Sequence, residues 1–440
     1  MPSDQPDSHR SIEARIVAGS VTLLSGSGLA SALNLAYNVA VARLLGPRAF
    51  GHAAAVYTLL ILASAATLAF QIVCAKLVSQ QSTPQEKSAA YRVLHRCAWG
   101  CGLLAAFALF VLRGWIAAWL HLPTPLLVML LAVGVAFYVP LGARRGYAQG
   151  ALSFRRFAGN LALEGAVRLV GSLIAIGLGF GVAGVIAANA AAVAICWIAI
   201  APSLASPAAG ALRLPRASRE VLQALVFYSG LVLINNSGIV LVKHYLLPVE
   251  AGLYAAVAMV GRVIFLFSSA VVNSMFPVVA GARPEERRSG RALRAALFLV
   301  VGVGVAAVVA LRLMPAAVWR FIFGARFTTS GPWSLSYLFA MFAAATVIYS
   351  LSIVIATWEM SYRIANSSWV QLAFSGVLIA AICRFHDSLH QVIAVQLLLM
   401  ILLLVAVSLP FLHGALRTAR TRGGGQKPET DLTRVFESPG

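Results

Sequence analysis

Twelve long runs of apolar residues, separated by short polar connections, organise this chain of 440 residues. A helix needs about 20 mainly apolar residues to cross a bilayer, and each run approaches or exceeds that length. In lipid the backbone must form its hydrogen bonds within the segment, and the short connections leave no room for barrel strands, so we expect helices. The predicted spans are 16–42, 50–75, 93–113, 126–148, 157–179, 181–204, 221–243, 252–279, 292–314, 332–357, 364–383 and 389–412.

Composition supports a membrane protein. Apolar residues make up 60% of the chain and charged residues 11%, against about 25% charged in soluble domains. The first run is too long for the core of a signal peptide, so we expect it to be retained as a span. Cys97 and Cys101 lie one turn apart without His or carboxylate company, which favours packing over metal binding. The sequence therefore predicts an all-α polytopic membrane protein.

The basic residues that give the chain its net charge of +20 are spread unevenly over the connections between the spans. If the N-terminus is cytoplasmic and the spans alternate, 24 of the 34 Lys and Arg residues fall on the inner side and eight on the outer side. That bias is the positive-inside pattern, and it predicts that both termini are cytoplasmic. A nucleic-acid binder would instead gather its basic residues on one face, so we expect no nucleic-acid partner.

An internal repeat divides the chain. The segment Leu45–Ala55 resembles Leu246–Ala256 at a constant offset, and each segment opens the second span of its half. Six spans followed by six in the same orientation predict two parallel lobes around a central cavity. We expect an N-terminal lobe at 1–212, a C-terminal lobe at 213–412 and a disordered cytoplasmic tail at 413–440.

Three polar residues of the fifth predicted span, Asn160, Glu164 and Arg168, recur at every fourth position. At about 100° per residue they form one stripe along the helix. Charge inside a membrane costs roughly 2.5–3.5 kcal/mol per residue, so it usually finds a partner or a cavity. Either Glu164 and Arg168 only neutralise each other, or they face the cavity, with Arg168 binding substrate and Glu164 coupling transport to an ion.

Arg262 lies in the middle of the eighth predicted span, on a stripe with Tyr254, Ser269 and Asn273. No acid lies within one turn of Arg262, so either another helix or an anion neutralises its charge. A guanidinium offers phosphate a planar fork of donors. We therefore predict that Arg262 and Asn273 line the cavity and bind an anionic substrate.

Three further residues complete the predicted substrate-binding set. Lys243 ends the seventh predicted span about two turns after Asn235, so it either reaches the cavity rim or snorkels to the interface. Arg43 precedes the first outer loop, where we expect it to line the outer mouth. No catalytic or metal-ligating set is expected.

Several short segments follow one another along the chain in a recognisable order: Ala42–Gly51, Gly146–Gly150 with Phe154, Glu164 with Arg168, Val242–Tyr245, Glu250–Tyr254, Phe276–Pro277, and Phe323–Gly324 with Phe327. Through these segments, which are spread over the whole chain, the sequence resembles the polysaccharide-transporter branch of the multidrug/oligosaccharidyl-lipid/polysaccharide exporter superfamily. Relatives often carry an aspartate where this chain has Gly238, so ion coupling by an acid at that position is not expected here.

The resemblance implies an oligosaccharide flippase. Such a protein moves polyprenyl-pyrophosphate-linked oligosaccharide across the bacterial inner membrane by alternating access, for O-antigen, capsule or exopolysaccharide assembly. Its partners would be lipid-linked oligosaccharide, membrane lipids and polysaccharide assembly proteins. No cofactor is expected, and because the chain lacks a P-loop motif, energy would come from an ion gradient or the membrane potential.

Two other functions are open to the sequence. A multidrug exporter of the same superfamily would favour an acidic cavity, whereas the spans here carry one clear acid and two arginines. A membrane-embedded glycosyltransferase or ligase would need a carboxylate or His near the outer face, where His386, Asp387 and His390 form a small cluster. We expect that cluster to be a solvated turn and the protein to be no enzyme.

Overall fold

The computed structural model describes residues 6–205, 214–280, 287–329, 332–360 and 367–423, and within these ranges it contains thirteen helices and no strand. The predicted fold class is confirmed. The helices are α1 Pro6–Ser79, α2 Pro84–Val111, α3 Arg113–Trp119, α4 Leu126–Gly150, α5 Phe154–Gly177, α6 Gly181–Ala199, α7 Leu214–Tyr245, α8 Pro248–Ala280, α9 Arg287–Leu313, α10 Ala316–Phe323, α11 Leu335–Met360, α12 Ser367–Arg384 and α13 Leu389–Gly423.

Ten stretches among the described residues are long and apolar enough to cross a membrane. One of them, Ser25–Ser79, has 55 residues and breaks at Gly46, where φ is 78° and ψ is 172°. Pro47 follows at once and cannot donate to the preceding turn, so α1 contains the first two predicted spans. Trp369–Arg384 is a shorter apolar helix at the eleventh predicted span. Each of the twelve predicted spans therefore coincides with a helix over most of its described length, although the sixth ends early, at Ala199.

Three features differ from the sequence expectations. The short helices α3 and α10 lie in segments predicted as connections, because seven or eight residues are too few for a periodic signal. Helix α13 continues to Gly423, so the first part of the predicted disordered tail is helical. That part contains three Arg, two Ala and one Leu, which are strong helix formers. The rest of the tail and the predicted boundary at 212 lie outside the described residues.

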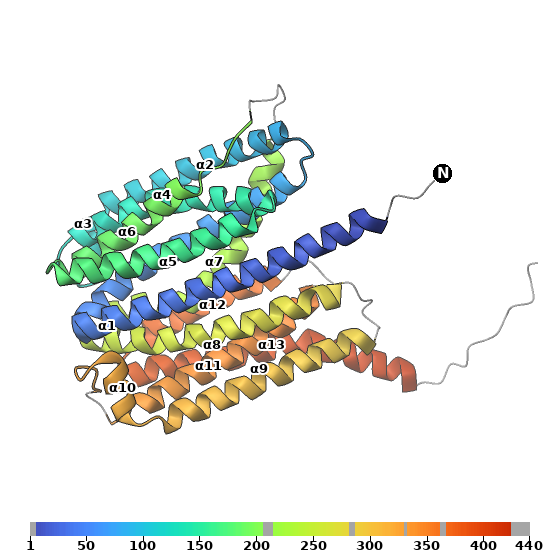
Figure 1. Cartoon of the computed structure of the whole chain (residues 1–440). Helices are drawn as coiled ribbons and strands as arrows, with labels where there is room; N and C mark the ends of the chain where they lie inside the picture. Colours follow the sequence, from blue (N-terminus) through green and yellow to red (C-terminus); the bar gives the residue numbers. More distant parts are fainter. Residues whose placement is uncertain (1–5, 206–213, 281–286, 330–331, 361–366, 424–440) are drawn as a thin grey trace, which may run out of the picture.

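The helices form two bundles that lie side by side (Figure 1). We call α1–α6 the first lobe and α7–α13 the second lobe. Helix α1 packs against α4 and α5 of its own lobe and against α7 and α8 of the other. The short helices α3 and α10, one from each lobe, lie at the same end of the molecule as the break in α1 (Figure 1). We call this the α3/α10 end; the start of α1 and the end of α13 lie at the opposite end.

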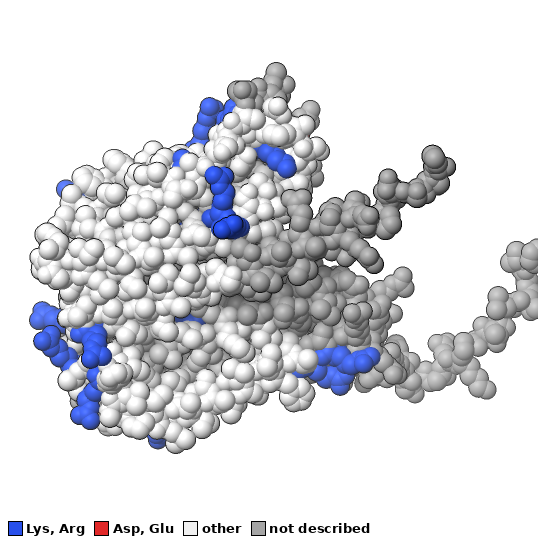
Figure 2. Space-filling view, in the orientation of Figure 1, with Lys and Arg blue, Asp and Glu red and all other residues white. Residues whose placement is uncertain are grey.

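The lobes share an apolar core. Its buried members include Tyr37, Val41 and Phe50 of α1 together with residues of α7, α8, α10, α11, α12 and α13. Figure 2 shows a broad uncharged surface on the face in view, with Lys and Arg gathered toward the two ends. An uncharged belt between charged ends is what a bilayer requires of a multi-pass membrane protein.

The two copies of the sequence repeat touch one another. A β-carbon on Gly51 would lie 2.7 Å from the Pro248 carbonyl oxygen, and one on Gly252 would lie 1.9 Å from the Pro47 carbonyl oxygen. Gly51 matches Gly252 and Pro47 matches Pro248 in the repeat, so the contact is reciprocal. Only glycine lets the two backbones approach so closely. The repeat therefore brings the lobes together around a local two-fold relationship.

Candidate functional site

A buried charge cluster occupies the first lobe, between α4 and α5. Glu164 Oε2 accepts a hydrogen bond from Arg145 at 2.7 Å, and Glu164 Oε1 accepts one from Arg168. Arg145 Nε also donates to Asn160 Oδ1 at 2.8 Å. All four residues are at most 7% exposed. Two guanidinium groups thus share one carboxylate, which leaves the cluster with a net charge of one positive unit.

Helix α1 supplies further partners of this cluster. Arg168 donates to the Asn34 side-chain oxygen at 3.0 Å and to the Tyr57 hydroxyl. Its guanidinium also lies over the Tyr57 ring, 4.8 Å from the centroid. A charged group with this many partners is held in one position. Arg168 is therefore locked within the first lobe in this conformation and offers little surface to a ligand.

Arg262 in α8 has a different environment. Its guanidinium donates to the Asn236 side-chain oxygen at 2.9 Å, which is a neutral partner. Within the described part of the chain, no carboxylate lies within ion-pair distance of Arg262. The carboxylate of Glu164 pairs with Arg145 and Arg168 instead. A pairing of Arg262 with Glu164 across the lobes is thus not present.

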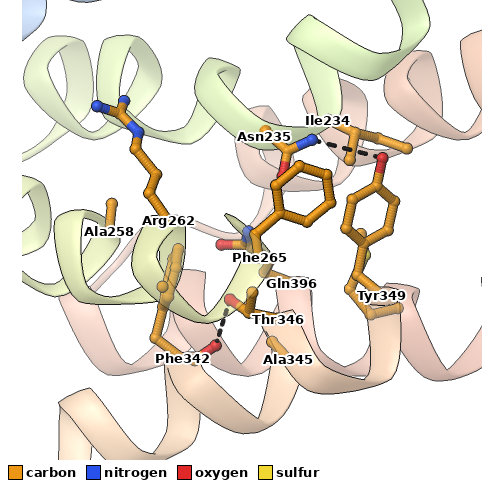
Figure 3. Close-up of a pocket in the computed structure, with 12 residues that line it drawn as sticks. Ile234, Asn235, Ala258, Arg262, Phe265, Phe342, Ala345, Thr346, Tyr349 and Gln396 are labelled. Carbon is orange, nitrogen blue, oxygen red and sulfur yellow. Dashed lines mark hydrogen bonds between the residues drawn. The ribbon is translucent and has the colours of Figure 1, made fainter. Parts of the chain in front are cut away.

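The aliphatic part of Arg262 borders a pocket in the second lobe (Figure 3). Its guanidinium extends away from the aromatic side chains Phe265 and Tyr349, so the head group lies apart from the apolar side of the pocket. The pocket is lined by Ile234, Asn235, Ala258, Gly261, Arg262, Phe265, Phe342, Ala345, Thr346, Tyr349, Gln396 and Met400. It combines apolar walls with a few amide and hydroxyl groups, as small-molecule sites do.

Tyr57 lies between the charge cluster of the first lobe and Arg262 of the second. Its hydroxyl accepts a hydrogen bond from Arg168, and the same group lies close enough to Arg262 to interact with it electrostatically. Tyr57 belongs to the first lobe and Arg262 to the second, so the Arg262 head group is directed to the region between the lobes. The charges of Arg145, Arg168 and Arg262 exceed that of Glu164 by two positive units.

Two predicted site residues lie at the α3/α10 end instead of the centre. Lys243 is fully buried, and its ammonium group donates to the carbonyl oxygens of Leu120 at 2.7 Å and His121 at 3.3 Å. Arg43 donates to the Phe321 carbonyl oxygen of α10. In this conformation Lys243 therefore lies within a contact between the lobes and not at the rim of a cavity, and Arg43 bridges the lobes.

The other two predicted residues lie in the second lobe. Asn235 lines the pocket, and its amide donates to the Leu231 carbonyl at 2.8 Å and to the Tyr349 hydroxyl at 3.4 Å (Figure 3). The side chain of Asn273 lies outside the described residues. Among the predicted residues whose side chains are described, Asn235 and Arg262 alone are brought to the same pocket.

Sequence reasoning missed Arg145 and Tyr57. Arg145 lies near the end of a predicted span, where it counted as a basic residue of the following loop. The structure places it inside α4, 5% exposed. The burial of Glu164 and Arg168 could have indicated that other helices supply them with partners. Tyr57 carries no charge, so nothing in the sequence pointed to it.

The His386, Asp387 and His390 cluster does not assemble as a unit. The His386 ring stacks on Tyr245 at 3.9 Å, whereas the His390 ring stacks on Trp333 at 4.3 Å. No group of three or more possible metal ligands occurs in the described ranges. The two imidazoles are thus used separately in packing.

Both the sequence and the structure of this chain resemble known proteins. A family model described as "Polysaccharide biosynthesis protein" matches residues 40–332. No curated protein sequence matches significantly. The structure resembles lipid II flippase MurJ in an inward closed conformation, with a TM-score of 0.70 and 12% identity over 89% of this chain and 87% of that one.

Two further solved structures share the fold. An inward-facing multidrug resistance MATE family transporter of the MOP superfamily has a TM-score of 0.66 and 12% identity, covering 92% of this chain and 99% of that one. A MOP superfamily transporter from Pyrococcus furiosus, with a binding pocket described as of reverse polarity, has a TM-score of 0.57 and 12% identity over 93% and 96% of the chains. At these identities the likeness establishes the two-lobe transporter fold.

Proposed function

Because the chain belongs to the polysaccharide biosynthesis protein family and has the two-lobe fold of MOP superfamily transporters, we propose that it is a flippase for polyprenyl-pyrophosphate-linked oligosaccharide. In this proposal it lies in a bacterial inner membrane with both termini cytoplasmic. The sugar head crosses between the lobes while the polyprenyl tail stays in lipid. O-antigen, capsule and exopolysaccharide precursors all have this chemistry.

The observation that carries the proposal is the environment of Arg262. Its guanidinium lies inside the membrane protein, is directed between the lobes, and has the neutral Asn236 side chain as its described hydrogen-bond partner. A partly buried cation without a carboxylate favours an anion, and a guanidinium matches the oxygens of a pyrophosphate. The positive unit left over in the Arg145, Glu164 and Arg168 cluster acts in the same direction.

Energy for the cycle is proposed to come from an ion gradient or the membrane potential. Glu164 was the candidate for ion coupling, but two arginines hold its carboxylate in this conformation. Coupling through Glu164 would require this cluster to open. We therefore assign Glu164 a structural role first, and propose that the membrane potential acts on the charged complex of protein and substrate.

The experiment is transport by the purified protein in liposomes. A polyprenyl-pyrophosphate-linked oligosaccharide is placed in both leaflets, and a membrane-impermeant glycosidase is added outside. Without transport only the outer-leaflet pool is cleaved, whereas a flippase would make nearly the whole pool accessible. Imposing a membrane potential of either sign tests the proposed energy source.

An organic cation is the control cargo. A multidrug exporter would move the cation and leave the inner-leaflet oligosaccharide uncleaved. The positive surplus around Arg262 opposes a cation, because like charges repel strongly where water is excluded. Transport of the cation alone would replace the flippase proposal with the exporter alternative.

A further inference from the structure

The α3/α10 end holds hydrogen bonds between the lobes that involve basic side chains. Arg43 of the first lobe donates to the Phe321 carbonyl oxygen in the last turn of α10, and its guanidinium lies over the Phe321 ring at 5.6 Å. A carbonyl in the last turn of a helix has no partner within that helix. A side chain of the first lobe thus supplies the hydrogen bond that a helix end of the second lobe lacks.

The second lobe makes the matching contact. At the end of α3 the backbone N–H of Leu122 bonds the Ala117 carbonyl, and that of His121, at a φ of 48°, bonds the Ala118 carbonyl. These two bonds close the helix end, and the carbonyls of Trp119, Leu120 and His121 are left without a partner in the turn. Lys243 donates to two of them, Leu120 and His121, and His244 Nδ1 lies 2.6 Å from the third, that of Trp119.

The two contacts occupy matching places in the repeat. Arg43 and His244 are related by the offset that relates Gly51 to Gly252, and α3 and α10 each follow the third span of their lobe. Each lobe therefore uses the end of its first span to hold the C-terminal end of the short helix of the other lobe.

We infer that Arg43 with the end of α10, and Lys243 with His244 at the end of α3, form two cross-lobe latches that keep the α3/α10 end closed. Both latches must open for the lobes to separate there, with water taking over the carbonyls. The inference rests on the proposed function only where it gives the latches a purpose, which is to control release of substrate at this end. Their effect on the equilibrium between closed and open lobes does not depend on the substrate.

Distance measurements between spin labels test the latches without substrate. Labels are attached at Leu178→Cys in the first lobe and Leu313→Cys in the second, two exposed positions at this end. The exposed cysteines Cys97, Cys101 and Cys383 are replaced by serine. The background protein is compared with Arg43→Met, Lys243→Met and the double variant.

We expect each single substitution to raise the ratio of long to short label distances about tenfold, because hydrogen bonds from charged donors are the strong ones. The double variant should shift further. The matched control is Arg113→Met, since Arg113 also donates to a helix-end carbonyl, that of Phe110 at 2.7 Å, and covers the Phe110 ring, but within one lobe. Its distances should equal those of the background protein.

The inference is overturned if the double variant keeps the background distances, or if Arg113→Met lengthens them equally. Arg43 is exposed, so its variant should fold even where loss of the buried Lys243 prevents accumulation. In that case unchanged distances in Arg43→Met alone overturn the inference. Because substrate is absent, a failure of the flippase proposal in liposomes leaves this result unaffected.

Discussion

The hydroxyl group of Tyr254 occupies the space beside Gly238. A β-carbon added to Gly238 would lie 2.2 Å from the Tyr254 hydroxyl oxygen. That hydroxyl donates to the Gln396 side-chain oxygen at 2.8 Å, so α7, α8 and α13 meet at this point. The Tyr254 side chain therefore leaves no room for a larger residue at position 238.

We predict that Gly238→Ala destabilises the protein. The added methyl group must displace Tyr254 and its hydrogen bond to Gln396, and overpacking of this kind costs about 1–3 kcal/mol. The melting temperature of the purified protein in detergent should fall, and Tyr254→Phe in the same chain should recover part of the loss by removing the hydroxyl oxygen.

The control for this prediction is Gly376→Ala in α12, where a β-carbon would meet nothing within 4 Å. There alanine should stabilise slightly or have no effect, because it favours a helix more than glycine does. Equal melting temperatures for Gly238→Ala and Gly376→Ala would show that Tyr254 yields without cost.

A second prediction concerns the carboxylate that two arginines share. Glu164→Gln leaves Arg145 and Arg168 buried without a counter-charge, and breaking a buried ion pair in this way costs about 3–5 kcal/mol. We expect a strongly reduced folded yield, measured by size-exclusion chromatography after solubilisation. Normal yield with loss of oligosaccharide transport would instead return Glu164 to the coupling role.

Its control is Glu220→Gln. Glu220 pairs with Lys76 at 3.0 Å, and the Glu220 and Lys76 side chains are 22% and 53% exposed. Ion pairs that water reaches contribute about 0–1 kcal/mol, so this variant should lose much less folded yield than Glu164→Gln. A similar loss of yield in both variants would show that the assay does not separate buried from exposed pairs.

The contact between the repeat glycines gives a third prediction. Gly252→Ala places a methyl group against the Pro47 carbonyl, where no side chain can give way because the obstacle is backbone. We expect a loss of folded yield or a separation of the lobes at the α3/α10 end, read as longer distances between the labels at 178 and 313. Gly302→Ala, which meets nothing within 4 Å, should leave both unchanged.

Periodicity and length were enough to predict the spans, and the repeat was enough to predict two lobes. Each rests on a signal that lipid imposes along the chain, since every span must be about 20 residues long and apolar. The i to i+4 spacing of Glu164 and Arg168 likewise fixed their ion pair, because helical neighbours at that spacing share a face.

The partners contributed by other helices could not be predicted in this way. Arg145 joins Glu164 from α4, and Lys243 reaches the end of α3 in the other lobe, contacts that depend on how helices pack. Lys243 also shows why a cation at a span end is ambiguous. A lysine that snorkels to the interface and a lysine that caps a helix end within the protein look the same in the sequence, because both stand at the end of a span.

The last prediction separates charge from geometry at Arg262. If its guanidinium recognises a pyrophosphate with its planar fork, Arg262→Lys should keep part of the transport rate and Arg262→Ala should lose about tenfold or more. The measurement is glycosidase-accessible oligosaccharide in liposomes, normalised to the amount of folded protein. Arg312→Ala is the control, because Arg312 is an exposed arginine of the same lobe that lies 6.0 Å from the Tyr337 ring, and it should transport normally. A folded Arg262→Ala variant that transports at the unaltered rate would remove Arg262 from recognition, and the positive surplus between the lobes would then need another explanation.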